Sequence, residues 1–278
     1  SLDEDPVWSE LGATSVARYR DIEKTSGIGF FDEIGYTRIH HDEAVVERSA
    51  NHALLFSGKR PEVMSGDEAN KRFPFFHFEP GETIGYQPLD AGRINPRGYV
   101  DAMSTVACSN GAQIIDDHAV EMIVRDDNVQ VHTAGGQTLS SERVIVATGA
   151  YSTFDNLLPI LLPLHVRGRT IVMVPVGDAT LSDLNGMPSV GCHPGNGRVR
   201  TYWHPPVTYP DGQKYLKIGG GPEGPQRIAN LNELNEWLRS DGDPEIADAY
   251  RAELHRMMPG LDLSDSITAA CVTSETHS

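Results

Sequence analysis

The sequence has few cysteines, fewer basic than acidic residues, and no long hydrophobic run. Its three cysteines, Cys108, Cys192 and Cys271, lie far apart without CxxC or Cys/His spacing, which argues against a disulfide framework or a zinc site and favours a reducing compartment. The 23 Lys and Arg against 39 Asp and Glu form no basic cluster for a nucleic-acid backbone. No run approaches the ~18 apolar residues of a membrane helix. We therefore expect a soluble cytoplasmic protein that binds no nucleic acid and spans no membrane.

The 278 residues, 39% of them apolar, are enough for a sizeable core, and we expect two lobes. The clearest helix signal covers 97–109, where Asn95 can cap, Pro96 can occupy the first turn, and Asn110 precedes a terminating glycine. A capping box is expected at Ser65 and Glu68, three residues apart. Further helices are expected over 16–25 with Ser15 as cap, and over 42–57, 228–238 and 243–258.

Strands are expected wherever apolar residues alternate between turn signals. These segments are 28–31, 35–39, 112–115, 119–124, 129–131, 164–176, 199–203, 215–218 and 266–272, with 119–131 starting an antiparallel meander. The run 143–147 is apolar on both faces, which predicts a buried strand of a parallel sheet that leads directly into Thr148 and Gly149.

Several functional motifs are weak or missing. Residues 219–224 satisfy G-x-G-x-x-G, but Pro222 and Pro225 remove amide donors and Glu223 repels phosphate, so we interpret them as a turn. The eleven histidines show no HExxH or facial-triad spacing, and we expect no metal site. An isolated cysteine such as Cys271 is by default a small buried apolar residue.

Four stretches of the sequence together resemble a known superfamily. They are residues 25–28 with 35–37, residues 64–74, the block from Gly92-Arg93-Ile94-Asn95-Pro96 through Val144 to Ser152, and Ala269-Ala270-Cys271-Val272-Thr273. In order and spacing they resemble the D-amino-acid oxidase and sarcosine oxidase superfamily of FAD-dependent oxidoreductases. The resemblance runs through most of the chain.

The resemblance implies a mixed α/β (α+β) fold. A partial FAD-binding, Rossmann-like layer with a β-meander would combine with a substrate lobe made of an antiparallel sheet and flanking helices. Residues 1–83 and 156–261 would belong to the substrate lobe, residues 84–155 to the core of the FAD lobe, and residues 262–278 to a strand that returns to the FAD lobe.

The resemblance also implies FAD as cofactor and an amino acid or N-methylated amine as small-molecule substrate, whose C–N bond is oxidised by hydride transfer from carbon to flavin N5. Tyr202 matches an aromatic residue that faces the substrate. The backbone of Val120 matches the adenine contact, and Cys271 matches a position that carries flavin covalently in some members. The remaining cofactor contacts implied are Ala147, Thr148, Gly149, Ala150 and Tyr151.

Gly221 stands where sarcosine oxidases have an active-site histidine, which argues against sarcosine as substrate. The superfamily's N-terminal phosphate-binding βαβ unit and its C-terminal flavin-facing segment have no counterpart here, so the chain resembles an interior fragment, with weak or no FAD retention and no activity alone. The alternative is a non-catalytic flavoprotein-like subunit or interaction module without bound cofactor. A third hypothesis is a truncated product whose exposed apolar sheet edges would favour aggregation or a homo-oligomer.

Overall fold

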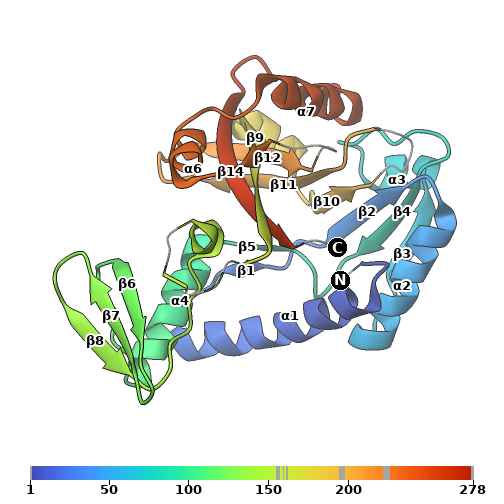
Figure 1. Ribbon diagram of the computed structural model, residues 1–278. Coiled ribbons are helices and arrows are strands. Elements are labelled where there is room, and N and C mark those ends of the chain that lie inside the picture. The colour runs from blue at the N-terminus through green and yellow to red at the C-terminus, as the bar shows by residue number, and fades with distance from the viewer. Residues whose placement is uncertain are drawn as a thin grey trace. The chain divides into compact units, whose positions relative to one another are not determined.

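The computed structural model describes residues 2–154, 157–158, 160, 162–193, 198–221 and 226–276. These residues form a mixed α/β fold (Figure 1), which confirms the predicted class. They divide into two compact units. Unit 1 comprises the described residues of Ser1–Ala112, Ile171–Glu223 and Pro244–Thr268, and unit 2 those of Gln113–Thr170, Gly224–Asp243 and Ala269–Ser278. The assignment of segments to a substrate lobe and an FAD lobe stays a prediction.

Unit 1 is built on a mostly antiparallel sheet. The sheet contains the second half of β9 (Leu164–Pro175), then β12 (Lys214–Gly220), β11 (Thr201–Thr208), β10 (Ser189–Cys192), β2 (Tyr36–His40), β4 (Thr83–Gln87) and β3 (Glu62–Ser65) in that order. Only β10 and β2 run parallel among these neighbours. A separate pair joins β1 (Phe31–Asp32) to β5 (Arg93–Ile94). The helices of this unit are α1 (Pro6–Ser26), α2 (Glu43–Ser57), α3 (Gly66–Arg72), α4 (Pro96–Ser109), α5 (Asp178–Asp183) and α7 (Pro244–Met257).

The predicted helix ends are largely confirmed. Asn95 accepts hydrogen bonds from the first turn of α4, and Ser65 and Glu68 form the capping box of α3. The expectation for α1 was wrong at its start, since Asp5 rather than Ser15 caps it, ten residues earlier in the chain. Pro6 fits that first turn because its missing amide has no partner to lose there.

The core of unit 1 lies on one face of the sheet, against α7 and a group of phenylalanines. Trp203 of β11 is fully buried beside Leu216 and Ile218 of β12. Tyr250 and Leu254 of α7 belong to the same cluster. Burial of this apolar surface is the main stabilising term of the unit.

A network of buried ion pairs lies at the edge of this core. Glu253 of α7 accepts hydrogen bonds from Arg198 Nη2 and Arg256 Nη2, both at 2.8 Å. The same two arginines bind Glu82, which is fully buried, and Glu79. Burial opposes the charge of Glu253, but the two arginines outweigh it and lower the pKa of this carboxyl.

Unit 2 contains the predicted meander and a second small core. β6 (Ala119–Val124), β7 (Val129–Thr133) and β8 (Thr138–Ser141) form the three-stranded sheet coloured green in Figure 1. The first half of β9 pairs with β13 (Arg227–Ile228) and β14 (Ile267–Thr276). Helix α6 (Leu231–Leu238) contributes Leu234 and Trp237 to a cluster that also contains Ala150 of the 3₁₀ turn η1 (Gly149–Thr153).

Two predicted strands are absent. Residues 112–115 and 143–147 are irregular, and Ile145, expected to be buried, is 92% exposed. A strand buried on both faces needs neighbours that satisfy its amides and carbonyls, and no strand among the described residues pairs with 143–147. In the part of the chain that the structure describes, no helix combines the length and apolar character needed to cross a bilayer.

Candidate functional site

The face of the unit 1 sheet opposite the core carries two tyrosines, each lying over a glycine. Gly191 of β10 pairs with Tyr202 of β11, and Tyr202 pairs on its other side with Gly219 of β12. A Cβ on Gly191 would lie 1.9 Å from Tyr36 Oη, and a Cβ on Gly219 would lie 2.7 Å from Tyr202 Oη. Both phenol groups therefore extend across a neighbouring strand where only glycine leaves room. Burial raises the pKa of Tyr36, so its hydroxyl is a neutral hydrogen-bonding group.

His204 and Lys217 continue this face beside Tyr202. The two residues are register partners on β11 and β12, so their side chains share the face. The His204 ring lies 5.5 Å from the Tyr202 ring, centre to centre, and Lys217 Nζ lies 5.5 Å from the same ring. His204 Nδ1 is 3.1 Å from Ser189 Oγ. Burial, with the charges of Lys217 and Arg93, lowers the pKa of His204 to about 4, so the imidazole is neutral at pH 7.

A cavity of about 770 Å³ adjoins this face. His204 and Lys217 line it, together with the starts of α4 and β12. Arg93 holds one wall in place, because Nε donates to Asp32 and Nη1 donates to the carbonyls of Pro205 (2.8 Å) and Pro206 (3.2 Å). The register of β11 against β12 shifts between His204 and Val207, so β12 does not pair with these two prolines.

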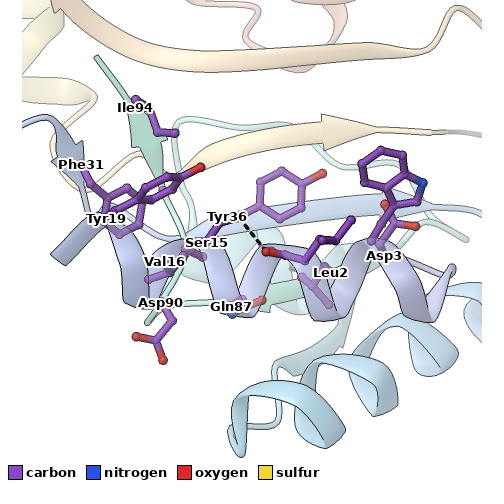
Figure 2. Close-up of a pocket in the computed structure, with 15 residues that line it drawn as sticks. Leu2, Asp3, Ser15, Val16, Tyr19, Phe31, Tyr36, Gln87, Asp90 and Ile94 are labelled. Atoms are coloured by element: carbon purple, nitrogen blue, oxygen red, sulfur yellow. Dashed lines mark hydrogen bonds between the residues drawn. The ribbon is translucent and has the colours of Figure 1, made fainter. Parts of the chain in front are cut away.

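A second, more apolar hollow of about 430 Å³ lies between α1 and the start of β2 (Figure 2). In Figure 2, Tyr19 of α1 lies beside Phe31, their ring centres 5.8 Å apart. The dashed bond in the picture joins Ser15 Oγ to the Leu11 carbonyl. Tyr36 also lines this hollow, so its ring borders the hollow while its hydroxyl lies over Gly191.

Of the residues predicted from the sequence, only Tyr202 lies in unit 1, and the others lie in unit 2. Val120 is 51% exposed, and the register shift between Ala119 and Glu121 leaves it without a partner on β7. Its amide and carbonyl are thus outside the regular ladder, as a contact to an adenine edge would require.

Helix α6 contacts both the end of the segment 147–151 and Cys271. Ala147, Thr148 and Gly149 are exposed, and Gly149 has a φ of +59° with no atom within 4 Å of the position of a Cβ. Ala150 is buried against the α6 cluster, and Tyr151 Oη donates to Asn235 of that helix. The Cys271 carbonyl accepts a 2.9 Å hydrogen bond from Trp237, also on α6.

One group has the residue types of a metal site. His41, Glu79 and Glu82 lie with their ligand atoms within 4.8 Å of one another. Arg198 and Arg256 already bind both carboxylates, however, and neutralise the charge that a cation would need. The group is therefore part of the structural ion network. Of the predicted turn at 219–224, residues 222–224 lie outside the described residues.

We expect acid to destabilise the protein through two partly buried histidines. Burial lowers the pKa of both His204 and His193 from 6.5 to about 4, so the unfolded chain binds more protons between these values and stability falls as pH drops from 6.5 to 4. For His204, this pKa shift corresponds to a loss of at most about 3 kcal/mol in the free energy of unfolding. The free energy of unfolding, measured in urea at pH 7 and at pH 5, should fall less between these two pH values in His204→Gln than in wild type. His118→Gln, at an exposed side chain, serves as control. An unchanged pH slope in His204→Gln would contradict the assignment.

The sequence matches the family described as FAD dependent oxidoreductase (DAO) over residues 2–276. The chain belongs to this family. No curated protein sequence matches it significantly.

Among solved structures, Amadoriase I, a fructosyl amine:oxygen oxidoreductase from Aspergillus fumigatus, is 18% identical with a TM-score of 0.68, over 98% of this chain and 63% of that one. NikD, an amino acid oxidase of nikkomycin biosynthesis, is 19% identical with a TM-score of 0.68, over 95% and 66%. L-proline dehydrogenase from P. horikoshii is 15% identical with a TM-score of 0.68, over 97% and 67%. This chain thus spans less than two thirds of Amadoriase I.

The residues of this family member fit part of FAD. Val120 lies outside the ladder and the small residues 147–149 are exposed, so their backbones are open to a ligand, as the predicted adenine and ribose contacts require. The pyrophosphate has no comparable partner among the described residues of unit 2. At the start of α6, the Glu233 amide donates to Asn230, and the Ala229 amide just before the helix donates to the Glu233 carboxylate, which would repel a phosphate.

The sequence predicted Tyr202 as a site residue, and it lies on this face, but the prediction did not include Tyr36, His204 or Lys217. His204 lies two residues after Tyr202, so strand alternation could have placed it on the same face. Tyr36 comes from a strand more than 150 residues earlier, and no local pattern connects it with Tyr202. The glycines opposite the tyrosines are also visible only in the paired sheet.

Proposed function

We propose that this chain is the substrate-binding part, and a portion of the flavin-binding part, of an FAD-dependent enzyme that oxidises the C–N bond of an amine or amino acid. The observation that supports this most is the polar sheet face, with Tyr36, Tyr202 and neutral His204, in a member of the flavoenzyme family. The names of the three solved relatives refer to a fructosyl amine, an amino acid and L-proline, all of which are amines. Val120, Cys271 and residues 147–151 are proposed as cofactor contacts.

FAD, when bound, accepts the hydride from the carbon next to the substrate nitrogen. The protein's part is to orient that carbon and to keep the amine unprotonated. The Tyr202 and Tyr36 hydroxyls can hold the substrate by hydrogen bonds on the sheet face. The charged Lys217 beside them disfavours a second cation, and neutral His204 adds none, so the site lowers the pKa of a bound amine.

The test uses the complete gene product. We expect a yellow protein whose flavin absorbance bleaches on adding an α-amino or N-methyl acid without oxygen. Tyr202→Phe should slow the bleaching roughly tenfold because a hydrogen bond of about 1 kcal/mol or more to the substrate is lost. Tyr99→Phe, in a separate aromatic cluster, should leave the rate unchanged. A colourless product that FAD does not reconstitute would contradict the proposal.

A colourless product would instead favour a non-catalytic flavoprotein-like subunit or interaction module. The exposed apolar run at 143–147 would then be a surface for a partner strand. Weak FAD retention by the isolated chain stays a prediction under both readings.

A further inference from the structure

The 770 Å³ hollow of unit 1 is strongly cationic, although the protein carries a net charge of −16. Four basic side chains line the 770 Å³ cavity, and Asp32 is its sole acidic one among the described residues. The basic residues are Arg93, Arg97, Lys214 and Lys217. The chain has 39 acidic and 23 basic residues, so its composition does not lead one to expect a cluster of four basic side chains. The positive potential of such a cluster favours a ligand of negative charge.

Internal pairing does not neutralise this charge. Arg93 and Asp32 satisfy each other at 2.8 Å, which removes the single carboxylate of the lining. Neither Arg97 nor Lys214 forms an ion pair with any carboxylate in the part of the chain that the structure describes. Lys217, whose Nζ lies 5.5 Å from the Tyr202 ring, also lines the cavity.

The remaining lining suits a small organic molecule. Leu181 and Val207 provide apolar surface, while Thr208 and Tyr209 provide hydroxyl groups. The volume lies within the range of about 300 to 1,000 Å³ typical of small-molecule pockets. A site of this size has no room for a nucleic-acid backbone.

We propose that this cavity binds an acidic group, a carboxylate or a phosphate, through Arg97 and Lys214, and that this group is an acidic tail of the enzyme's amine substrate, separate from any α-carboxylate. The assignment of this acidic group to the substrate rests on the proposed function. His204 and Lys217 belong both to the cavity lining and to the sheet face that carries Tyr202. A substrate whose amine lies at Tyr202 would therefore place a tail in the cavity, and the basic residues select a tail with negative charge.

The binding test uses the isolated chain, without flavin, and isothermal titration calorimetry at low salt. Glutarate and inorganic phosphate are the probes, and uncharged glutaramide is the neutral analogue. We expect saturable binding of at least one anion, no binding of glutaramide, and weakening at higher ionic strength. The two probes distinguish a carboxylate ligand from a phosphate ligand.

Arg97→Gln and Lys214→Gln should each weaken the binding of the preferred anion about tenfold, because each removes one charge-assisted hydrogen bond. Lys24→Gln, at an exposed lysine on α1, is the matched control and should bind as wild type does. No saturable anion binding, or equal affinity of all three variants and wild type, would overturn the proposal.

The substrate part is tested separately on the complete gene product, by comparing N-methylglutamate with N-methylleucine. Faster flavin bleaching by the acidic amine, lost in Lys214→Gln, would support the substrate assignment. Equal bleaching by both amines, unaffected by Lys214→Gln, would overturn that assignment while the proposed oxidase activity stands. Anion binding in the cavity without oxidation of any amine would contradict the proposed function and leave the anion site intact.

Discussion

Glu253→Gln is expected to lower the free energy of unfolding by about 3 kcal/mol. The Glu253 side chain is 7% exposed and accepts hydrogen bonds from Arg198 and Arg256, whose side chains are 21% exposed. Removing this carboxylate leaves two largely desolvated guanidinium groups to share Glu79 and Glu82. A charge left without its partner costs more than the pair itself contributes to stability, which is why the expected effect is large.

Urea unfolding followed by tryptophan fluorescence measures this effect, because Trp203 lies fully buried in the core of the same unit. Asp248→Asn is the control on the same helix. Asp248 is 76% exposed and pairs with Arg251, so its loss should cost less than about 0.5 kcal/mol. Similar unfolding midpoints for the two variants would show that the buried network adds little to stability.

Gly92→Ala is expected to destabilise unit 1 by about 3 kcal/mol or more. A Cβ on Gly92 would lie 1.9 Å from the Asp32 carbonyl oxygen and 3.0 Å from the Ile34 amide nitrogen, both backbone atoms. No rotamer change relieves a clash with the backbone, so β1 and β5 must separate. Their pairing carries the contact between Asp32 and Arg93, which fixes a wall of the cationic cavity.

Thermal unfolding followed by circular dichroism should show this loss as a clear fall in Tm. Gly260→Ala is the matched control, because no atom lies within 4 Å of its Cβ position and its φ is not positive. That variant should unfold within a degree or two of wild type. A Gly92→Ala protein as stable as the control would mean that the two strands can move apart at little cost.

Helix boundaries were predictable where local chemistry sets them. Asn95 with Pro96, and Ser65 with Glu68, satisfy amides within three residues of themselves, so the signal is contained in the sequence. The start of α1 was missed because its cap, Asp5, precedes a helix with little amphipathic pattern, in which Ser9 is the one buried residue.

Strands were less predictable, because their formation depends on distant partners. The run 143–147 has the composition of a buried strand, yet it stays unpaired among the described residues. The reverse holds for Ser189–Cys192, which carries no clear strand pattern but forms β10 between β2 and β11. There the ladder on both sides, rather than intrinsic preference, stabilises the extended chain.

By itself, the sequence determined the caps of α3 and α4, the acidic charge and the family resemblance, because each depends on residues within a short stretch or on composition; Tyr202 as a site residue stays a prediction. Only the tertiary structure decided that Tyr36, Tyr202, His204 and Lys217 share one face of a sheet and that Arg97 and Lys214 line one cavity. The physical reason is that side chains on different strands share a face only through strand order and register, and the register that brings Tyr36 to this face is set by hydrogen bonds between β2 and β10, more than a hundred residues apart.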